Sequence, residues 1–211
     1  MPPKKPAAKP AAKPAAKPGA AKAPAKKPAA KAGAAPAKAE PVPEKPKALP
    51  ENEIGLKQIN VVLGDTEGKI KESGRWPIVV DEAGRVMVFL QHRDCNSINA
   101  LDSHDMAPEM IRKGLLGAIR YGKPFVINLV EMGDIGIVED RFNEIMPDLF
   151  NLVLSKKILE EDVYMKLVRP NDDEDYKCPF GVGEAFIFLF VSENQELSET
   201  TKGRTIIYRI A

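Results

Sequence analysis

From Gly74 to Arg85 the sequence GRWPIVVDEAGR predicts a strand followed by a turn, the order found around a phosphate-binding loop. A short β-branched strand, Ile78 to Val80, leads into an acidic turn that ends in a glycine. The apolar run from Val86 to Leu90 predicts a helix after the turn. Many nucleotide-binding domains hold phosphate at this position, so the chemistry of the turn decides whether a nucleotide can bind.

The turn lacks the groups that hold a phosphate. A phosphate loop needs glycines for close backbone approach, a lysine for the β- and γ-phosphates, and a serine or threonine for Mg²⁺. This turn instead holds Asp81, Glu82, Gly84 and Arg85, with one cation against two carboxylates that repel phosphate. We interpret these four residues as a degenerate phosphate loop, and we expect no catalytic and no cofactor-binding residues.

Polar residues near later strands have simpler interpretations than catalysis. An ATPase ends its next central strand in adjacent acids that hold Mg²⁺ and polarise water, whereas this strand reads NLVEM at 128–132. Glu131 and Asp134 are close but not adjacent, so we interpret them as solvating the end of the strand. Asn194 lies roughly where a polar sensor residue would be, and an ordinary loop asparagine is the simpler interpretation.

Metal-binding patterns are equally sparse. His92 and Cys95 form one His-x-x-Cys pair, and His104 follows without completing a second pair, so a surface or loop role is favoured over zinc. The acidic run 172–175 has neither the glycine nor the spacing of a calcium loop and is interpreted as a solvated connection. We expect no metal site, and Cys95 and Cys178 predict reduced thiols in a cytoplasmic protein.

An α/β domain over residues 50–211 must position these groups. Two segments, PFVINLV at 124–130 and EAFIFLFV at 184–191, are almost continuously apolar, which is typical of central strands in a parallel sheet covered on both faces. We therefore predict a three-layer sandwich with a mostly parallel sheet of roughly five strands. Strand signals fall at 58–63, 77–81, 97–101, 125–130, 185–191 and 205–210.

Two helices are also predicted. Apolar residues from Met106 to Ile119 recur on one helical face, with Ser103 or Asp105 as the N-cap and Gly122 as the end. A second apolar stripe runs over 142–153 and contains Pro147, which we expect to break or restart the helix.

Residues 1–49 predict a disordered basic arm. They repeat Lys-Pro-Ala-Ala and contain no large apolar side chain between Pro2 and Pro41, so burial cannot offset an ordering entropy of about 1–2 kcal/mol per residue. We expect partly polyproline-II chain, with neither a targeting peptide nor a membrane span. The first 39 residues hold no acid and carry about +10, whereas residues 40–211 carry about −9. The arm lysines are Lys4, Lys5, Lys9, Lys13, Lys17, Lys22, Lys26, Lys27, Lys31 and Lys38.

These lysines predict binding to a dense anionic polymer. Without arginine or aromatic residues in the arm, contact would be independent of sequence and sensitive to salt. Nucleic acid and the acidic microtubule surface both fit, because linker-histone tails and the proline-rich arms of microtubule-associated proteins have similar composition. A solvated linker without a partner is the third interpretation.

Four motifs occur in this order along the chain: VLGD (62–65), GRWPIVVDEAGRV (74–86), LLGAIRYGKPFVINLVE (115–131) and FIFLFVSENQE (186–196). They resemble successive landmarks of the fifth AAA+ module of dynein heavy chains, and the pattern is similar to the C-terminal domain of ciliary proteins that carry IQ motifs and ankyrin repeats. The most specific parts are Arg75-Trp76-Pro77 and Ala118-Ile119 with Gly122-Lys123-Pro124. The resemblance covers 56–210 and implies an AAA+-like core without a phosphate loop.

Several features depart from the dynein pattern. The turn at 81–85 does not keep the Gln-Gly-Gln of that module, and the helix after it lacks Trp-Ile-Lys. The sequence ends at Ala211, one residue after the last predicted strand, so we expect no helical lid. Trp76, at the start of a strand, is either a partner anchor or, more simply, a packing residue.

Arm and resemblance together predict a non-enzymatic structural or adaptor protein of a microtubule-based assembly. The expected location is the cytoplasm and cytoskeleton, specifically the axoneme of a cilium or flagellum, with tubulin and other axonemal proteins as partners and no membrane. One alternative is a protein associated with chromatin or RNA, although the arm lacks aromatic or arginine readers of nucleic acid. A second alternative is a phosphotransfer enzyme that binds nucleotide through an atypical loop.

Overall fold

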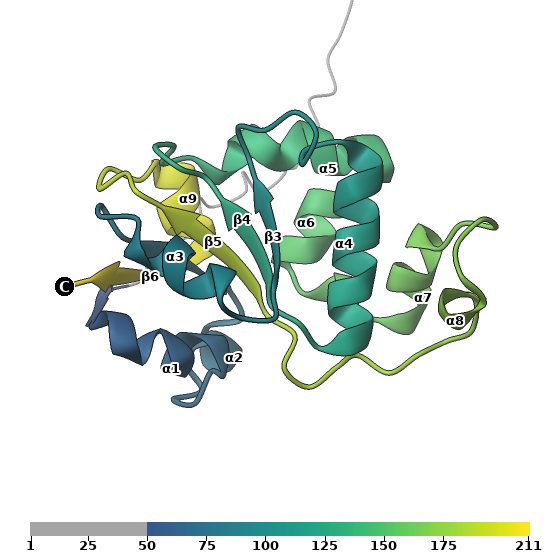
Figure 1. Ribbon diagram of the computed structural model, residues 1–211, viewed down its shortest axis with the longest axis horizontal. Coiled ribbons are helices and arrows are strands. Elements are labelled where there is room, and N and C mark those ends of the chain that lie inside the picture. The colour runs from purple at the N-terminus through teal and green to yellow at the C-terminus, as the bar shows by residue number, and fades with distance from the viewer. Residues whose placement is uncertain (1–49) are drawn as a thin grey trace, which may run out of the picture. The chain divides into compact units, whose positions relative to one another are not determined.

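The computed structural model describes residues 50–211, so the predicted arm and its ten lysines lie outside the described residues. These residues form an α/β domain around a six-stranded, entirely parallel sheet (Figure 1). The spatial order is β1-β6-β2-β5-β4-β3. The strands are β1 (Asn52–Ile54), β2 (Trp76–Val80), β3 (Asn96–Asn99), β4 (Phe125–Asn128), β5 (Phe188–Ser192) and β6 (Thr205–Ile210).

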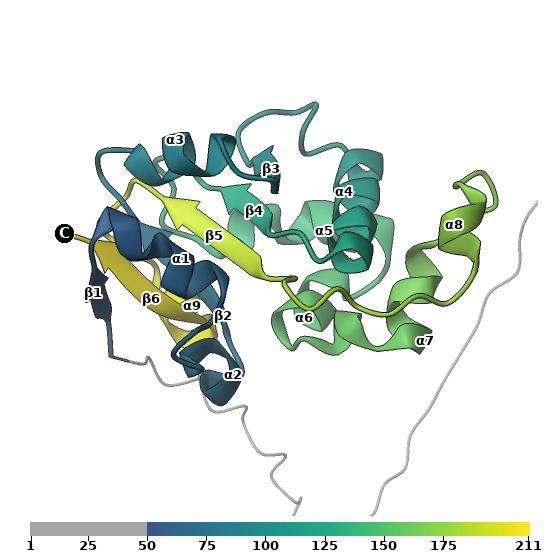
Figure 2. The same cartoon turned by 60° about the horizontal axis from the view of Figure 1, so that its bottom comes forward.

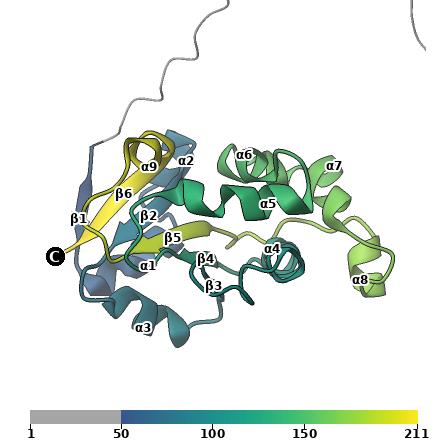
Figure 3. The same ribbon diagram turned by 90° about the horizontal axis from the view of Figure 1, so that it is seen from above.

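Helices cover both faces of the sheet. Figure 3 shows α1 (Ile59–Leu63) and α3 (Arg85–Gln91) on one face, and α5 (Glu139–Ile145), α6 (Leu149–Leu154) and α9 (Glu199–Arg204) on the other. Figure 2 shows α7 (Glu161–Tyr164) and α8 (Glu174–Lys177) beyond the sheet, on the side of α4. The remaining helices are α2 (Lys69–Ser73) and α4 (Pro108–Tyr121), with the 3-10 helices η1 (Leu56–Gln58), η2 (Ile135–Val138), η3 (Lys157–Leu159) and η4 (Met165–Leu167). No helix within residues 50–211 combines the length and apolarity needed to cross a bilayer.

The central strands are apolar because both of their faces are covered. Every residue of β2 and of β5 is buried, and the two strands pair in parallel through Ile78 and Phe190. Phe188 stacks on Phe125 of β4 with 5.5 Å between ring centroids. The prediction of a parallel sheet with buried central strands is therefore confirmed.

The two predicted helices form, with one correction. Gly122 ends α4 in the left-handed conformation, with φ of 66°, as its position after the apolar stripe predicts. The N-cap is Ala107, followed by a proline, and not Ser103 or Asp105. The carboxylate of Asp105 instead accepts a hydrogen bond from the N–H of Asn99, 3.1 Å away, at the end of β3.

The break at Pro147 is also present. Helix α5 ends before Met146, whose backbone is extended, and α6 begins after Asp148, whose φ is 64°. Pro147 has no backbone N–H to donate to the preceding turn, so it interrupts the helix. The apolar stripe over 142–153 is therefore divided between two short helices.

The strand predicted at 58–63 and the predicted count of roughly five strands are wrong. The segment 58–63 forms the end of η1 and helix α1, because Ile59 and Val62, three residues apart, are both buried on one helical face. The sheet has six strands because β1, whose three residues lack an apolar run, pairs with the outer side of β6. A three-residue edge strand carries almost no periodic signal in the sequence.

Candidate functional site

The degenerate phosphate loop lies at the point where the chain changes direction across the sheet. After β2 the chain passes through α3 towards β3, and after the adjacent β5 it passes through α9 towards β6, on the opposite face. In open α/β sheets, ligands bind at such switch points, outside the carboxyl ends of the strands. The turn 81–85 and the loop 193–198 therefore border the position where a ligand would be expected.

Asp81 fills this position with its own carboxylate. Its side chain is 1% exposed, and Oδ2 accepts a hydrogen bond of 2.7 Å from the N–H of Val86, at the start of α3. Oδ1 accepts from the guanidinium of Arg85 at 3.3 and 3.4 Å. Backbone N–H groups at a helix start are the groups that a bound phosphate would use, so an internal anion occupies their place.

The rest of the turn adds negative charge. Gly84 has φ of 66°, and a Cβ placed on it would lie 3.2 Å from Oε1 of Glu193. The carboxylate of Glu82 accepts a hydrogen bond of 3.3 Å from Gln195 in the facing loop. Arg85 is the single cation of the turn and is paired with Asp81. The arrangement disfavours an additional anion.

Residues after β4 and β5 tie the two loops together. Asn194 donates a hydrogen bond of 2.9 Å to the carbonyl of Glu131 and accepts one of 2.8 Å from the N–H of Glu196. Asp134 accepts from the N–H two residues further on at 2.9 Å and from the hydroxyl of Ser198 at 3.1 Å. Asn194 thus acts as a loop residue. Asp134 is the N-cap of η2, in the loop after β4.

Trp76 lies in the interior of the domain. It is 4% exposed, its indole N–H donates to the carbonyl of Val153 at 2.6 Å, and its ring meets Phe186 edge to face at 5.8 Å. This buried position favours the packing interpretation over that of a partner anchor.

The residues of the His-x-x-Cys pattern have separate surroundings in the fold. His92 and His104 are exposed, and the thiol of Cys95 donates to the carbonyl of Leu90 at 3.2 Å. Burial raises the pKa of the Cys95 thiol, which disfavours the reactive thiolate. Among residues 50–211, no three His, Cys, Asp or Glu side chains are grouped to hold a metal ion.

A buried ion pair escaped the sequence analysis. Arg112 of α4 is 1% exposed, and its guanidinium donates to both oxygens of Asp172 at 2.7 Å, to Glu109 at 2.6 and 3.0 Å, and to the carbonyl of Leu167 at 2.7 Å. Hydrogen bonding from Arg112 lowers the pKa of Asp172 to about 2. Asp172 is therefore not part of a solvated connection. Glu109 and Arg112, three residues apart, were the local signal, but nothing local points to a partner sixty residues away.

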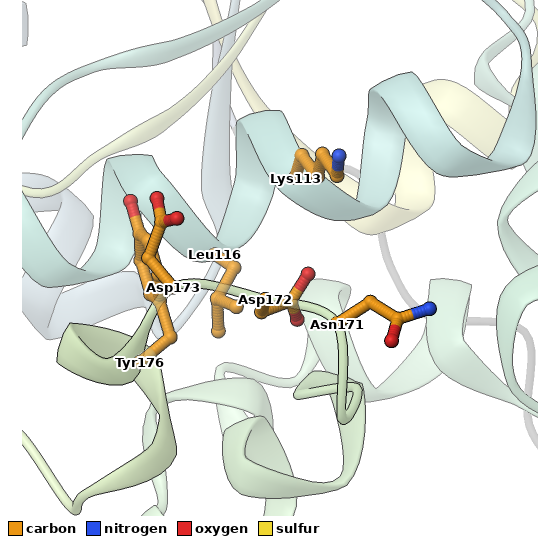
Figure 4. Close-up of a pocket in the computed structure, with 6 residues that line it drawn as sticks. All are labelled: Lys113, Leu116, Asn171, Asp172, Asp173 and Tyr176. Atoms are coloured by element: carbon orange, nitrogen blue, oxygen red, sulfur yellow. The ribbon is translucent and has the colours of Figure 1, made fainter.

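Figure 4 shows the small pocket beside this pair, of about 190 Å³. The carboxylate of Asp172 lines the pocket and is paired with Arg112. The ammonium of Lys113 lies 3.8 Å from the carboxylate of Glu109. The pair of Arg112 and Asp172 holds the segment before α8 against α4, so we assign the pocket a structural role. Its lining residues are Lys113, Leu116, Asn171, Asp172, Asp173 and Tyr176.

No protein-family model matches the chain.

Proposed function

We propose that this chain is a non-catalytic structural or adaptor protein of a microtubule-based assembly, specifically the ciliary axoneme. The observation that carries the non-catalytic part is the carboxylate of Asp81 at the start of α3. A doubly wound sheet offers a phosphate position there, and this chain fills the position with its own anion. The motif resemblance to the dynein AAA+ module supports an AAA+-like ancestry for the domain.

The arm supplies the proposed contact with the microtubule. Ten lysines within the first 39 residues, with no acidic residue among them, suit the acidic C-terminal tails of tubulin. The remainder of the chain carries about −9, so like charge keeps the folded domain from lying on the same surface. The domain would instead dock on other axonemal proteins.

Co-sedimentation with stabilised microtubules at low salt tests the role of the arm. Deleting residues 1–48 should abolish binding, and replacing the ten lysines by glutamine should do the same at constant length. A chain with the arm residues in scrambled order should still bind, because charge and not sequence makes the contact. Unchanged binding of the deletion variant would remove the arm from the mechanism.

Chromatin or RNA remains the alternative partner, favoured by the same lysines. Location of a tagged chain separates the two, since an axonemal protein concentrates in the cilium and a chromatin protein in the nucleus.

Nucleotide binding is tested by thermal unfolding with millimolar Mg-ATP. A ligand at 100 times its dissociation constant adds about 2.7 kcal/mol of stability. We expect no shift of the midpoint, because Asp81 already occupies the N–H group that a phosphate would use. A clear upward shift would instead support the phosphotransfer alternative.

A further inference from the structure

A larger cavity, of about 510 Å³, lies at the end of the strands opposite to the switch point. Trp76, the first residue of β2, and the segment 182–187 before β5 line it. Because all strands are parallel, this is the end of the sheet at which every strand begins, and it contains their amino ends. We call the cavity the amino-edge pocket. Its other lining residues are Leu63, Gly64, Asp65, Ile70, Lys71, Lys156 and Leu159.

The pocket has a fixed apolar wall. Ile70, Trp76 and Ile187 are buried, and Phe186 is half-buried beside them. The Trp76 ring is held in place by the bond from its N–H to the carbonyl of Val153. A volume of this size lies in the range of about 300–1,000 Å³ that is typical of sites for small molecules.

One cation is held at this wall. The ammonium of Lys156 lies 4.7 Å from the centre of the Trp76 ring and donates to the carbonyl of Ile70 at 2.7 Å. Its side chain is half-buried, and this burial lowers its pKa. The backbone of Lys156 has φ of 63°, an unfavourable conformation for a residue other than glycine. The fold therefore holds a poorly solvated ammonium against an aromatic face.

The charge of Asp65 raises the pKa of Lys156, but the hydrogen bonds of Asp65 go to other groups. Both carboxylate oxygens of Asp65 accept hydrogen bonds from α2, at 2.9 Å from the N–H of Ile70 and 2.8 Å from that of Lys71. Glu184 and Lys71 also line the pocket, and both residues are exposed. The ammonium of Lys156 keeps hydrogen-bonding capacity beyond its bond to Ile70, because an ammonium has three donors.

We propose that the amino-edge pocket binds a small amphipathic carboxylate, with its apolar body against Trp76 and Ile70 and its carboxylate on the ammonium of Lys156. The carboxylate would receive a charge-assisted hydrogen bond. This site is separate from the degenerate phosphate loop and does not depend on the proposed axonemal function.

The tryptophan itself reports on this site. Trp76 is the single tryptophan of the chain, so quenching of its fluorescence measures occupancy of the pocket. The probes are 1-naphthoate and its neutral analogue 1-naphthamide, which share the apolar body and differ in charge. The full chain should bind 1-naphthoate in a saturable manner and about tenfold or more tightly than the amide, the difference expected for a hydrogen bond to a charged group.

Three variants assign the preference to Lys156. Lys156→Met keeps an unbranched stem of similar length and should bind the two probes equally. Lys156→Arg keeps the charge and should keep a preference for the carboxylate. Lys157→Met is the matched control, because Lys157 is the exposed neighbour and does not line the pocket, and it should behave as the unmodified chain.

Circular dichroism identifies any variant that fails to fold, in which case Lys156→Arg and the unmodified chain carry the test. Absence of saturable quenching, or equal affinity for both probes in the unmodified chain, would overturn the proposal. So would an equal loss of preference in Lys157→Met and Lys156→Met, since the effect would then arise from general charge.

Discussion

Arg112 and Asp172 are each nearly removed from water, with 1% and 7% of their side chains exposed, and each satisfies the other's charge. Removing Asp172 leaves the guanidinium of Arg112 with Glu109 alone, whose side chain is 42% exposed. Loss of one buried partner is far more destabilising than the pair is stabilising. We therefore expect Asp172→Asn to lower the free energy of unfolding by about 3 kcal/mol, measured by urea denaturation at neutral pH. Asp173→Asn is the matched control, because its exposed neighbouring carboxylate makes no such pair. Equal stability of the two variants would contradict the role given to Arg112.

The same residue predicts a pH dependence. The pKa of Asp172 is about 2 in the folded domain, below the value of about 3.9 in an unfolded chain. The stability from this shift is therefore fully present above about pH 4 and is lost as the pH falls through about 2. Unfolding free energies measured from pH 5 to pH 2 should fall less steeply in Asp172→Asn than in the unmodified chain. Some slope should remain, because Arg112 also lowers the pKa of Glu109.

The loops that follow β4 and β5 pack directly against each other. A Cβ built on Gly133 would lie 2.0 Å from the carbonyl oxygen of Glu196, so only glycine fits without a shift of the backbone. The N–H of Ser198 donates to the carbonyl of Gly133 at 2.9 Å, and that of Glu193 donates to the carbonyl of Val130 at 2.7 Å. At the carboxyl ends of the strands, backbone contacts thus hold these two loops against each other and leave no room for a larger residue at Gly133.

We expect Gly133→Ala to destabilise the domain by at least about 1–3 kcal/mol, the usual range for overpacking. Gly181→Ala is the control, because a Cβ at Gly181 meets nothing within 4 Å. Thermal and urea unfolding of both variants give the comparison. If the two alanine variants were equally stable, the loops would have room to move apart.

Large apolar residues and the cluster of ten lysines lie in different parts of the chain. Residues 1–40 hold no large apolar side chain other than Met1, whereas Ile59 to Tyr208 supply a continuous buried core. A fragment of residues 50–211 should therefore keep the thermal midpoint of the full chain within about 2 °C, because hydrophobic burial dominates stability. Differential scanning calorimetry of both chains measures this. A fall of many degrees would mean that the first 49 residues stabilise the domain.

Local patterns in the sequence were sufficient for the central strands, α4, the helix break at Pro147 and the acidic chemistry of the turn 81–85. Each depends on periodicity, backbone propensity or side-chain type within a few residues. The edge strand β1 and the helix α1 were missed or misassigned, because their segments are too short for periodicity to distinguish strand from helix.

Only the tertiary structure places the turn at a switch point, seats the carboxylate of Asp81 on α3, joins Arg112 to Asp172, and encloses a pocket with Trp76 and Lys156. These features join residues that are far apart in the chain or depend on exact local geometry. Composition establishes which groups are present, including ten arm lysines and two acids in the turn. Strand order and packing decide which of those groups meet, because contacts over long sequence separations follow from topology.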